Sequence, residues 1–174
     1  QATFEKLSSI CQLMSRSQIV LNHNAVTDQV GIAKLHLYSE EYSGWNSLAN
    51  RPLEQYGINI KSTGIEDVEA TTIDEYCQAH NIDQIDLLKI DVEGAEYQVL
   101  LGARRMLKQK KIRCCVFEFG QTTFDMGNDP AVIEAYLWDL GYKIRNVVKG
   151  NPVFPGRANS KDARFSVHIA IPKS

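Results

Sequence analysis

The chain has 174 residues, of which 44% are hydrophobic and 23% charged, the composition of one folded domain rather than of a disordered segment. Its net charge is −2, from 19 Lys and Arg against 21 Asp and Glu, so no basic surplus is present to bind a nucleic acid. No run approaches the ~18 consecutive apolar residues of a membrane helix. We therefore expect neither a nucleic-acid partner nor a membrane partner.

Cysteine usage gives the next constraint. The four cysteines form no CxxC pair, so a zinc site is not expected. Cys114 and Cys115 are neighbours in an apolar run, where their side chains would point to opposite faces of a strand. This usage indicates free thiols in a reducing compartment, and we expect a cytoplasmic protein.

The first half of the chain alternates between helical and extended patterns. Hydropathy periods predict a helix at 3–15, strands at 18–26 and 30–38, a polar loop at 39–64, a strand at 68–73 and a helix that ends near 81. Thr72 and Glu75 fit a capping box at the start of that last helix, because the threonine oxygen can accept from the third helical amide.

The second half contains the clearest unit. A compact apolar strand at 85–91, a helix at 94–108 and a nearly continuous apolar strand at 112–119 form a βαβ arrangement with a right-handed crossover. Such strands suit a parallel sheet that is covered on both faces. A helix at 130–140 and strands at 142–149 and 165–171 complete the predicted elements.

Residues 89–96, KIDVEGAE, closely resemble the motif of FkbM-type methyltransferases. Weaker matches to the same family occur in order along the chain, at 25–28 (AVTD), 46–48 (NSL), 70–76 (ATTIDEY), 117–119 (FEF) and 140–142 (LGY). The resemblance covers nearly the whole chain. The long motif is specific, whereas the short matches gain weight only from their order.

The resemblance implies an α/β fold with the Rossmann-like sheet of class I methyltransferases, mostly parallel with an antiparallel C-terminal strand. Members of the family begin with a strand, a glycine-rich loop, a helix and a second strand, and the eleven glycines here form no such cluster. We therefore expect residues 1–174 to be a single partial methyltransferase domain that lacks the first βαβ segment and is inactive alone. The absent strands would lie between the third and fourth of the family, so the sheet would be interrupted there.

The activity that the resemblance implies is transfer of a methyl group from S-adenosylmethionine to a hydroxyl of a small molecule, such as a sugar or a polyketide-type metabolite. This displacement needs a group that accepts the hydroxyl proton. The candidate catalytic residues are Asp91, Glu93 and Glu118, because they lie at or just past strand ends, where open α/β sheets bind ligands. Glu118 also interrupts an apolar strand, which would be unfavourable without a role.

The candidate cofactor-binding residues are Asn24, Ala25 and Asp91. The first two resemble the place where class I methyltransferases contact adenine, and the resemblance places Asp91 near the methionine part or the acceptor. Other roles stay open, since Asp91 could cap the following helix and Glu93 could interact with its dipole. Glu96 is expected to be only a favourable first-turn charge.

Several alternatives accompany this interpretation. Magnesium bound by Asp91 and Glu118 is possible but not required by the sequence, and no dedicated metal site is expected. His168 is a minor alternative base, and Trp45 and Phe124 could wall an acceptor pocket. The chain could instead be a non-catalytic scaffold derived from a methyltransferase. A nucleotide-dependent oxidoreductase or glycosyltransferase is the least favoured possibility.

Overall fold

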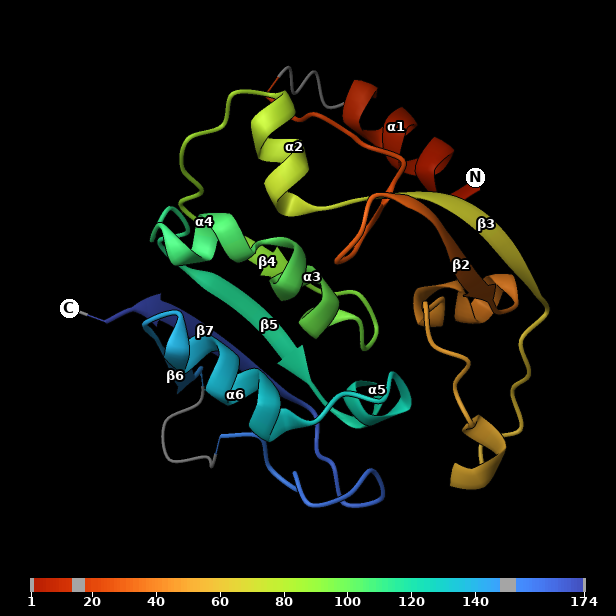
Figure 1. Cartoon of the computed structure of the whole chain (residues 1–174). Coiled ribbons are helices and arrows are strands. Elements are labelled where there is room, and N and C mark those ends of the chain that lie inside the picture. Colours follow the sequence, from red (N-terminus) through yellow and green to blue (C-terminus); the bar gives the residue numbers. More distant parts are fainter. Residues whose placement is uncertain (1, 14–17, 148–152, 174) are drawn as a thin grey trace.

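The computed structural model describes residues 2–13, 18–147 and 153–173 (Figure 1). Its helices are α1 (Ala2–Leu13), α2 (Ile73–Ala79), α3 (Glu96–Gly102), α4 (Arg104–Lys108), α5 (Gln121–Asp125) and α6 (Pro130–Asp139), with short 3₁₀ turns η1 (Glu40–Trp45) and η2 (Leu53–Tyr56). Its strands are β1 (Ala25–Val26), β2 (Gly31–Leu37), β3 (Gly64–Thr71), β4 (Leu88–Ile90), β5 (Cys115–Phe119), β6 (Tyr142–Asn146) and β7 (Ser166–Pro172). None of the helices described is long and apolar enough to cross a bilayer.

The strands form two mixed sheets. One has the order β1-β3-β2, with β1 parallel and β2 antiparallel to β3. The other has the order β4-β5-β7-β6, in which β4 and β5 are parallel while β7 runs antiparallel to both β5 and β6. The α/β class and the antiparallel C-terminal strand are confirmed. The expectation of one mostly parallel sheet is wrong, because β2 and β6 also pair in antiparallel ladders.

The boundary between the two sheets lies between β1 and β4. Within the described residues, β1 pairs only with β3 and β4 pairs only with β5. Each sheet therefore ends on a short strand with one open edge, and both open edges carry unpaired backbone groups. This division falls where an interruption is expected from the strand order of the family.

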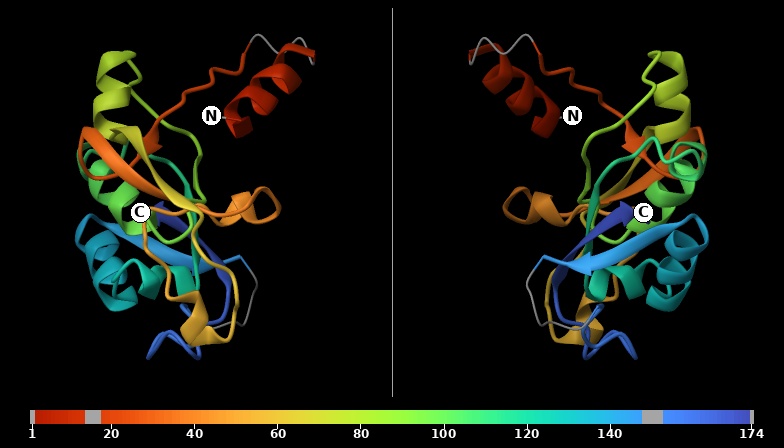
Figure 2. Two further views of the ribbon diagram at one scale, coloured as in Figure 1. Left: turned by 90° about the vertical axis from the view of Figure 1, so that its right-hand side faces the viewer. Right: turned by 90° about the vertical axis from the view of Figure 1, so that its left-hand side faces the viewer.

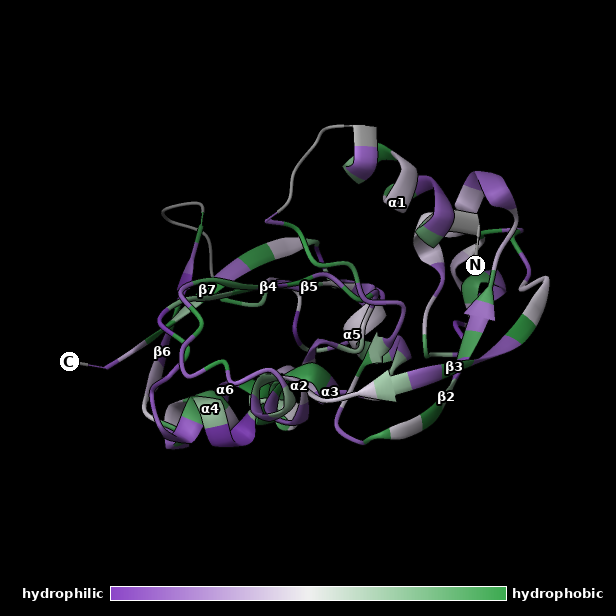
Figure 3. Cartoon of the chain, turned by 90° about the horizontal axis from the view of Figure 1, so that it is seen from above, coloured by the Kyte–Doolittle hydropathy of each residue, from purple (hydrophilic) through white to green (hydrophobic). Residues whose placement is uncertain are grey.

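Helices cover one face of the four-stranded sheet. Seen from above, α3, α4 and α6 lie along the same side of β4, β5 and β7 (Figure 3). The buried side chains between these layers come from both, and the largest are Leu100, Leu107, Phe117, Phe119, Leu137 and Tyr142. α1 stands on the opposite side, away from this helical layer (Figure 2). The core thus lies between the sheet and a single helical layer.

Several boundaries differ from the predicted ones. The strand expected at 18–26 is reduced to β1, because only Ala25 and Val26 find partners, on β3. The helix expected at 94–108 begins at Glu96 and is divided at Ala103, whose φ of −102° is not helical. The strand expected at 85–91 is reduced to β4, preceded by an isolated bridge from Ile85. The expected elements that run into 14–15 and 148–149 extend outside the described residues.

One helix cap and one close contact lie where helices meet the three-stranded sheet. The Thr72 hydroxyl accepts a hydrogen bond from the Glu75 amide (3.0 Å), which confirms this half of the expected capping box. Gly102, at the end of α3, lies so close to the Thr27 carbonyl that a Cβ would overlap it. Only glycine allows the helix to approach the sheet this closely.

Candidate functional site

The parallel register of β4 and β5 places two candidate acids at the same end of the sheet. Ile90 pairs with Phe117, so Asp91 follows β4 at the level where Glu118 lies on β5. Ile90 and Phe117 are buried under the helices, and alternation along a strand points Glu118 to the opposite face. Asp91 accepts a hydrogen bond from Lys89 on the same side (2.5 Å). The structure therefore brings Asp91 and Glu118 together, as expected.

The electrostatics of Glu118 follow from this placement. Burial raises the pKa of its carboxyl, and the neighbouring Asp91 and Glu93 raise it further. Lys89 acts in the opposite direction but does not outweigh these effects. Glu118 is thus a stronger base than a solvated glutamate, and it sits beside two further carboxylates.

The turn after β4 has an unusual backbone that determines where Glu93 points. Glu93 adopts a left-handed conformation (φ 52°), and Gly94 follows with φ 106°. A Cβ at Gly94 would overlap the Thr122 carbonyl of α5, so this position also requires glycine. The N-cap of α3 is Ala95, and no side-chain bond caps this helix. The capping role considered for Asp91 is therefore wrong.

Glu96 is the residue whose expected role changes most. It is 3% exposed, and its Oε1 accepts hydrogen bonds from the amides of Val92 (3.3 Å) and Gly94 (3.2 Å). Its Oε2 is buried without a hydrogen-bond partner among the described residues. Burial raises its pKa, against the effect of the amides. Glu96 is therefore a buried carboxylate that holds the turn, and the prediction of a mere first-turn charge is wrong.

The predicted polar loop contacts the candidate site through Ser47, which lies in the NSL match at 46–48, and through Arg51 and Tyr56, which no sequence pattern indicated. The Ser47 hydroxyl donates to the Glu93 carbonyl (2.7 Å), and Ser47 is buried. Arg51 Nε donates to Asp125 Oδ2 (3.2 Å), and Arg51 Nη1 lies 3.7 Å from Glu93 Oε2. The Tyr56 hydroxyl donates to the other oxygen of Asp125 (2.7 Å). The segment between β2 and β3, residues 38–63, thus lies against the turn after β4 and against α5. We call it the wall segment.

The charge state of Glu93 reflects these neighbours. Burial raises the pKa of its carboxyl, Arg51 lowers it and Asp91 raises it, with a net upward shift. The geometry does not support the alternative in which the Glu93 charge interacts with the dipole of α3, because α3 begins only at Glu96. Glu93 lies instead between the wall segment and Asp91.

The candidate cofactor residues are divided between the two sheets. Ala25 is in β1, paired with Ala70, and Asn24 precedes it with its amide hydrogen-bonded to Glu69 (3.4 Å). Asp91 follows β4 and pairs with Lys89. Asn24 and Asp91 therefore have different partners, and no hydrogen bond or ion pair between them is present in the described part of the chain.

The other candidates have structural positions. His168 is fully buried, its Nε2 lies 2.7 Å from the Ser166 hydroxyl, and burial lowers its pKa to about 4. It pairs with Phe117 and so lies in the core, not beside Glu118. Trp45 lies under Arg51 (5.5 Å to the ring centre), whereas Phe124 packs on a core ring. No three His, Cys, Asp or Glu residues in the described part could hold a metal, so magnesium gains no support.

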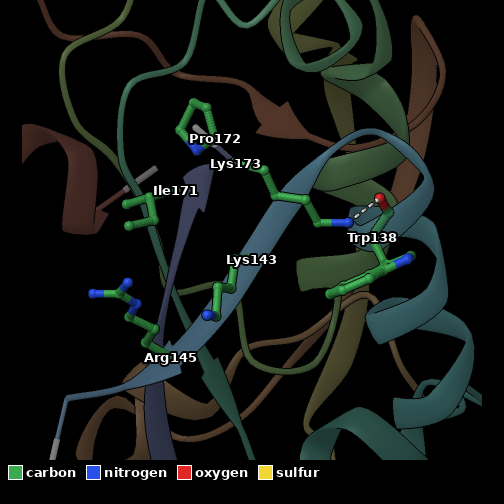
Figure 4. Close-up of a pocket in the computed structure, with 6 residues that line it drawn as sticks. All are labelled: Trp138, Lys143, Arg145, Ile171, Pro172 and Lys173. Carbon is green, nitrogen blue, oxygen red and sulfur yellow. Dashed lines mark hydrogen bonds between the residues drawn. The ribbon is translucent and has the colours of Figure 1, made fainter.

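A shallow pocket of about 470 Å³ lies at the other end of the sheet (Figure 4). It is lined by Trp138, Lys143, Arg145, Ile171, Pro172 and Lys173. The last three residues lie beyond Ala170, which pairs with the first residue of β5. The pocket is therefore remote from the carboxylates that follow β4 and β5.

The protein combines an α/β fold with acids at the ends of two parallel strands, and this is the end at which open α/β sheets bind their ligands. A family model described as the methyltransferase FkbM domain matches residues 3–144, and the chain belongs to this family. The membership points to methyltransferase activity in general. Neither the curated proteins nor the solved structures include a significant match.

Proposed function

We propose that this protein is an S-adenosylmethionine-dependent O-methyltransferase that acts on a hydroxyl of a small molecule, such as a sugar or a polyketide-type metabolite. The observation that carries the proposal is that Asp91 and Glu118 lie at the same level at the carboxyl ends of two parallel strands, in a chain of the FkbM family. Ligands of open α/β sheets bind at this end of the strands.

The residues present suit a cationic methyl donor. S-adenosylmethionine carries a sulfonium and an ammonium charge, and the carboxylates of Asp91, Glu93 and Glu118 form a negative region that would attract both. Asp91 would hold the methionine part, and Asn24 with Ala25 would contact the adenine. When bound, the cofactor supplies an activated methyl group.

The role of the protein is then to orient the hydroxyl and accept its proton. A carboxylate takes up a proton more readily as its pKa approaches the working pH. Burial raises the pKa of both Glu93 and Glu118, which makes either a better base than an exposed glutamate. The wall segment, fixed by Ser47 and Arg51, would exclude water from one side.

We further propose that residues 1–174 form a single partial domain that is inactive alone. The open edges of β1 and β4 support this, because each could pair with a further strand. The four free cysteines, of which Cys77 and Cys115 are buried, support a cytoplasmic setting.

The first test is calorimetric titration of the complete gene product with S-adenosylmethionine, followed by transfer of a labelled methyl group to hydroxyl compounds. We expect binding and labelled product. Absence of binding up to millimolar cofactor would contradict the proposal and favour the non-catalytic scaffold.

The second test is mutation of the site. Asp91→Ala should lower turnover by about 10²-fold while the fold is kept, as expected for loss of a positioned group. Lys143→Ala, in the pocket at the other end of the sheet, is the matched control and should leave turnover unchanged. Equal turnover in both variants would remove Asp91 from the site.

A further inference from the structure

We propose that Arg51 is a positioning residue, whose guanidinium is anchored by Asp125 and thereby fixes the side chain of Glu93 at the turn after β4. The significance of this for catalysis rests on the proposed function, whereas the contacts themselves do not. No sequence pattern singles out Arg51, which lies in the predicted polar loop.

The anchor is buried more deeply than the residue it serves. The Asp125 side chain is fully buried and that of Arg51 is 9% exposed, whereas that of Glu93 is 29% exposed. Arg51 Nε and the Tyr56 hydroxyl each take one oxygen of Asp125. The buried Asp125 carboxylate therefore holds Nε of the guanidinium, while Nη1 lies near the Glu93 carboxylate.

The geometry requires arginine in particular. The planar guanidinium presents several donors in fixed directions, so one nitrogen can bind Asp125 while another faces Glu93. The Trp45 ring, 5.5 Å from the guanidinium carbon, supports the same plane. A lysine has a single ammonium group, which could not contact Asp125 and Glu93 in the same fixed geometry.

The wall segment also holds the backbone of Glu93. The Ser47 hydroxyl donates to the Glu93 carbonyl, and Ser47 is fixed by its bridge to His36. The same segment thus contacts Glu93 twice, by a hydrogen bond to its carbonyl (2.7 Å) and by an ion pair with its carboxylate (3.7 Å). This double contact is more than a chance surface ion pair would provide.

Arg51 is also the cation that faces Glu93. On its own turn, Glu93 is near Asp91, and the acid of β5 is Glu118. From α5, Asp125 shares Arg51. Lys89 pairs with Asp91. Removing the charge of Arg51 would therefore leave Glu93 with only carboxylates as charged neighbours. Removing the charge of Asp125 would leave Glu93 as the remaining carboxylate partner of Arg51.

The experiment is a ¹³C carboxyl NMR titration of Glu93 in the complete protein. In the double variant Arg51→Gln/Asp125→Asn, which buries no unpaired charge, the Glu93 midpoint should move to higher pH. In Asp125→Asn alone it should move to lower pH. A role of Arg51 in packing alone would give no such opposite shifts, so unchanged midpoints or shifts in one direction would overturn the proposal.

Kinetics and rescue complete the test. The double variant should lower kcat at least about 10-fold, and the rising limb of its pH–rate profile should move with the NMR midpoint. Arg51→Lys should restore the charge effect on Glu93 but not the full rate. Opposite NMR shifts without any methyl transfer in the wild-type protein would uphold the positioning role and reject the proposed function. A lysine variant with the full wild-type rate would contradict the need for arginine.

Discussion

The two ends of the four-stranded sheet carry charge in opposite ways. At the carboxyl end of β4 and β5, the carboxylates of Glu96 and Asp125 are buried and are held by the turn after β4 and by Arg51 of the wall segment, whereas Asp91 is exposed and pairs with Lys89. At the other end, Lys143 and Arg145 are exposed on the edge strand β6 and line an open pocket. At the first end burial raises the pKa of Glu93, Glu96 and Glu118, whereas at the second end Lys143 and Arg145 stay in solvent.

This contrast shows why the visible pocket is a poor guide to the functional end. Exposed lysine and arginine on an edge strand discourage pairing with another chain, which accounts for the charges of β6. Lys173 lies over the Trp138 ring (3.0 Å) and donates to the Trp138 carbonyl, so part of the pocket wall is a local side-chain contact. Acids whose pKa is shifted by their surroundings cluster at functional sites, and among the described residues Glu93, Glu96 and Glu118 at the carboxyl end are such acids.

The largest effect should come from breaking the buried ion pair. Asp125→Ala would remove the closer partner of the buried Arg51 guanidinium and leave it only the more distant Glu93 carboxylate (3.7 Å), and should lower the free energy of unfolding by about 3–5 kcal/mol. Urea unfolding followed by circular dichroism measures this. Asp86→Ala, which breaks an exposed pair with Arg113, is the control and should change little. Similar losses in the two variants would contradict the contrast in burial.

The next effect concerns His168, which lies between the two ends. The unfolded chain takes up a proton near the ordinary pKa of 6.5, and the folded protein only near 4, so stability is lost as pH falls through this window. The loss should reach about 3 kcal/mol. Unfolding measured from pH 7 to 4 should show it in the wild type. If the free energy of unfolding of His168→Phe falls with pH as steeply as that of the wild type, the loss of stability comes from another group.

Glu96 should show the opposite pH dependence at the carboxyl end. Its folded pKa is raised, so the folded state keeps its proton to higher pH than the unfolded state, and stability falls as pH rises above 4.5. Glu96→Gln should remove this fall. Glu96→Ala should cost about 1–3 kcal/mol near pH 4, below this fall, because the amides of Val92 and Gly94 lose their acceptor, and the cost should shrink as the pH rises.

Hydrogen exchange provides the local check on the same residue. The Val92 and Gly94 amides should exchange faster in Glu96→Ala than in Glu96→Gln. Equal exchange in the two variants would show that the carboxylate does not hold the turn.

The smallest effect should come from the basic end. Lys143→Ala/Arg145→Ala removes two exposed cations and should leave cofactor affinity and turnover unchanged. A loss of turnover comparable to that of Asp91→Ala would move the functional end of the molecule to this pocket.

The βαβ unit could be predicted because its pattern is local. Apolar runs on either side of a helix indicate parallel strands, and the parallel register then brings Asp91 and Glu118 together. The strand expected at 18–26 fails because its pattern is extended but only its last two residues have a partner. Extended sequence alone does not supply a neighbouring strand.

The supporting residues could not be predicted, because their roles depend on distant contacts. Arg51 and Asp125 are 74 positions apart, and nothing in the polar segment around Arg51 indicates a buried ion pair. Glu96 has the sequence position of an ordinary first-turn acid, and only the turn that folds back over it makes it a buried acceptor. Periodicity reports which face of a helix is apolar, not which polar residue the rest of the chain covers.

The close approach of Gly102 to Thr27 has a consequence for the geometry of ligand binding. The spacing between Asn24 and Ala25 on one sheet and Asp91 on the other depends on a helix end with no side chain. A single methyl group there would act as a wedge and widen the span that a bound molecule must bridge. The reach of the candidate cofactor residues is thus governed from a position that would touch neither donor nor acceptor.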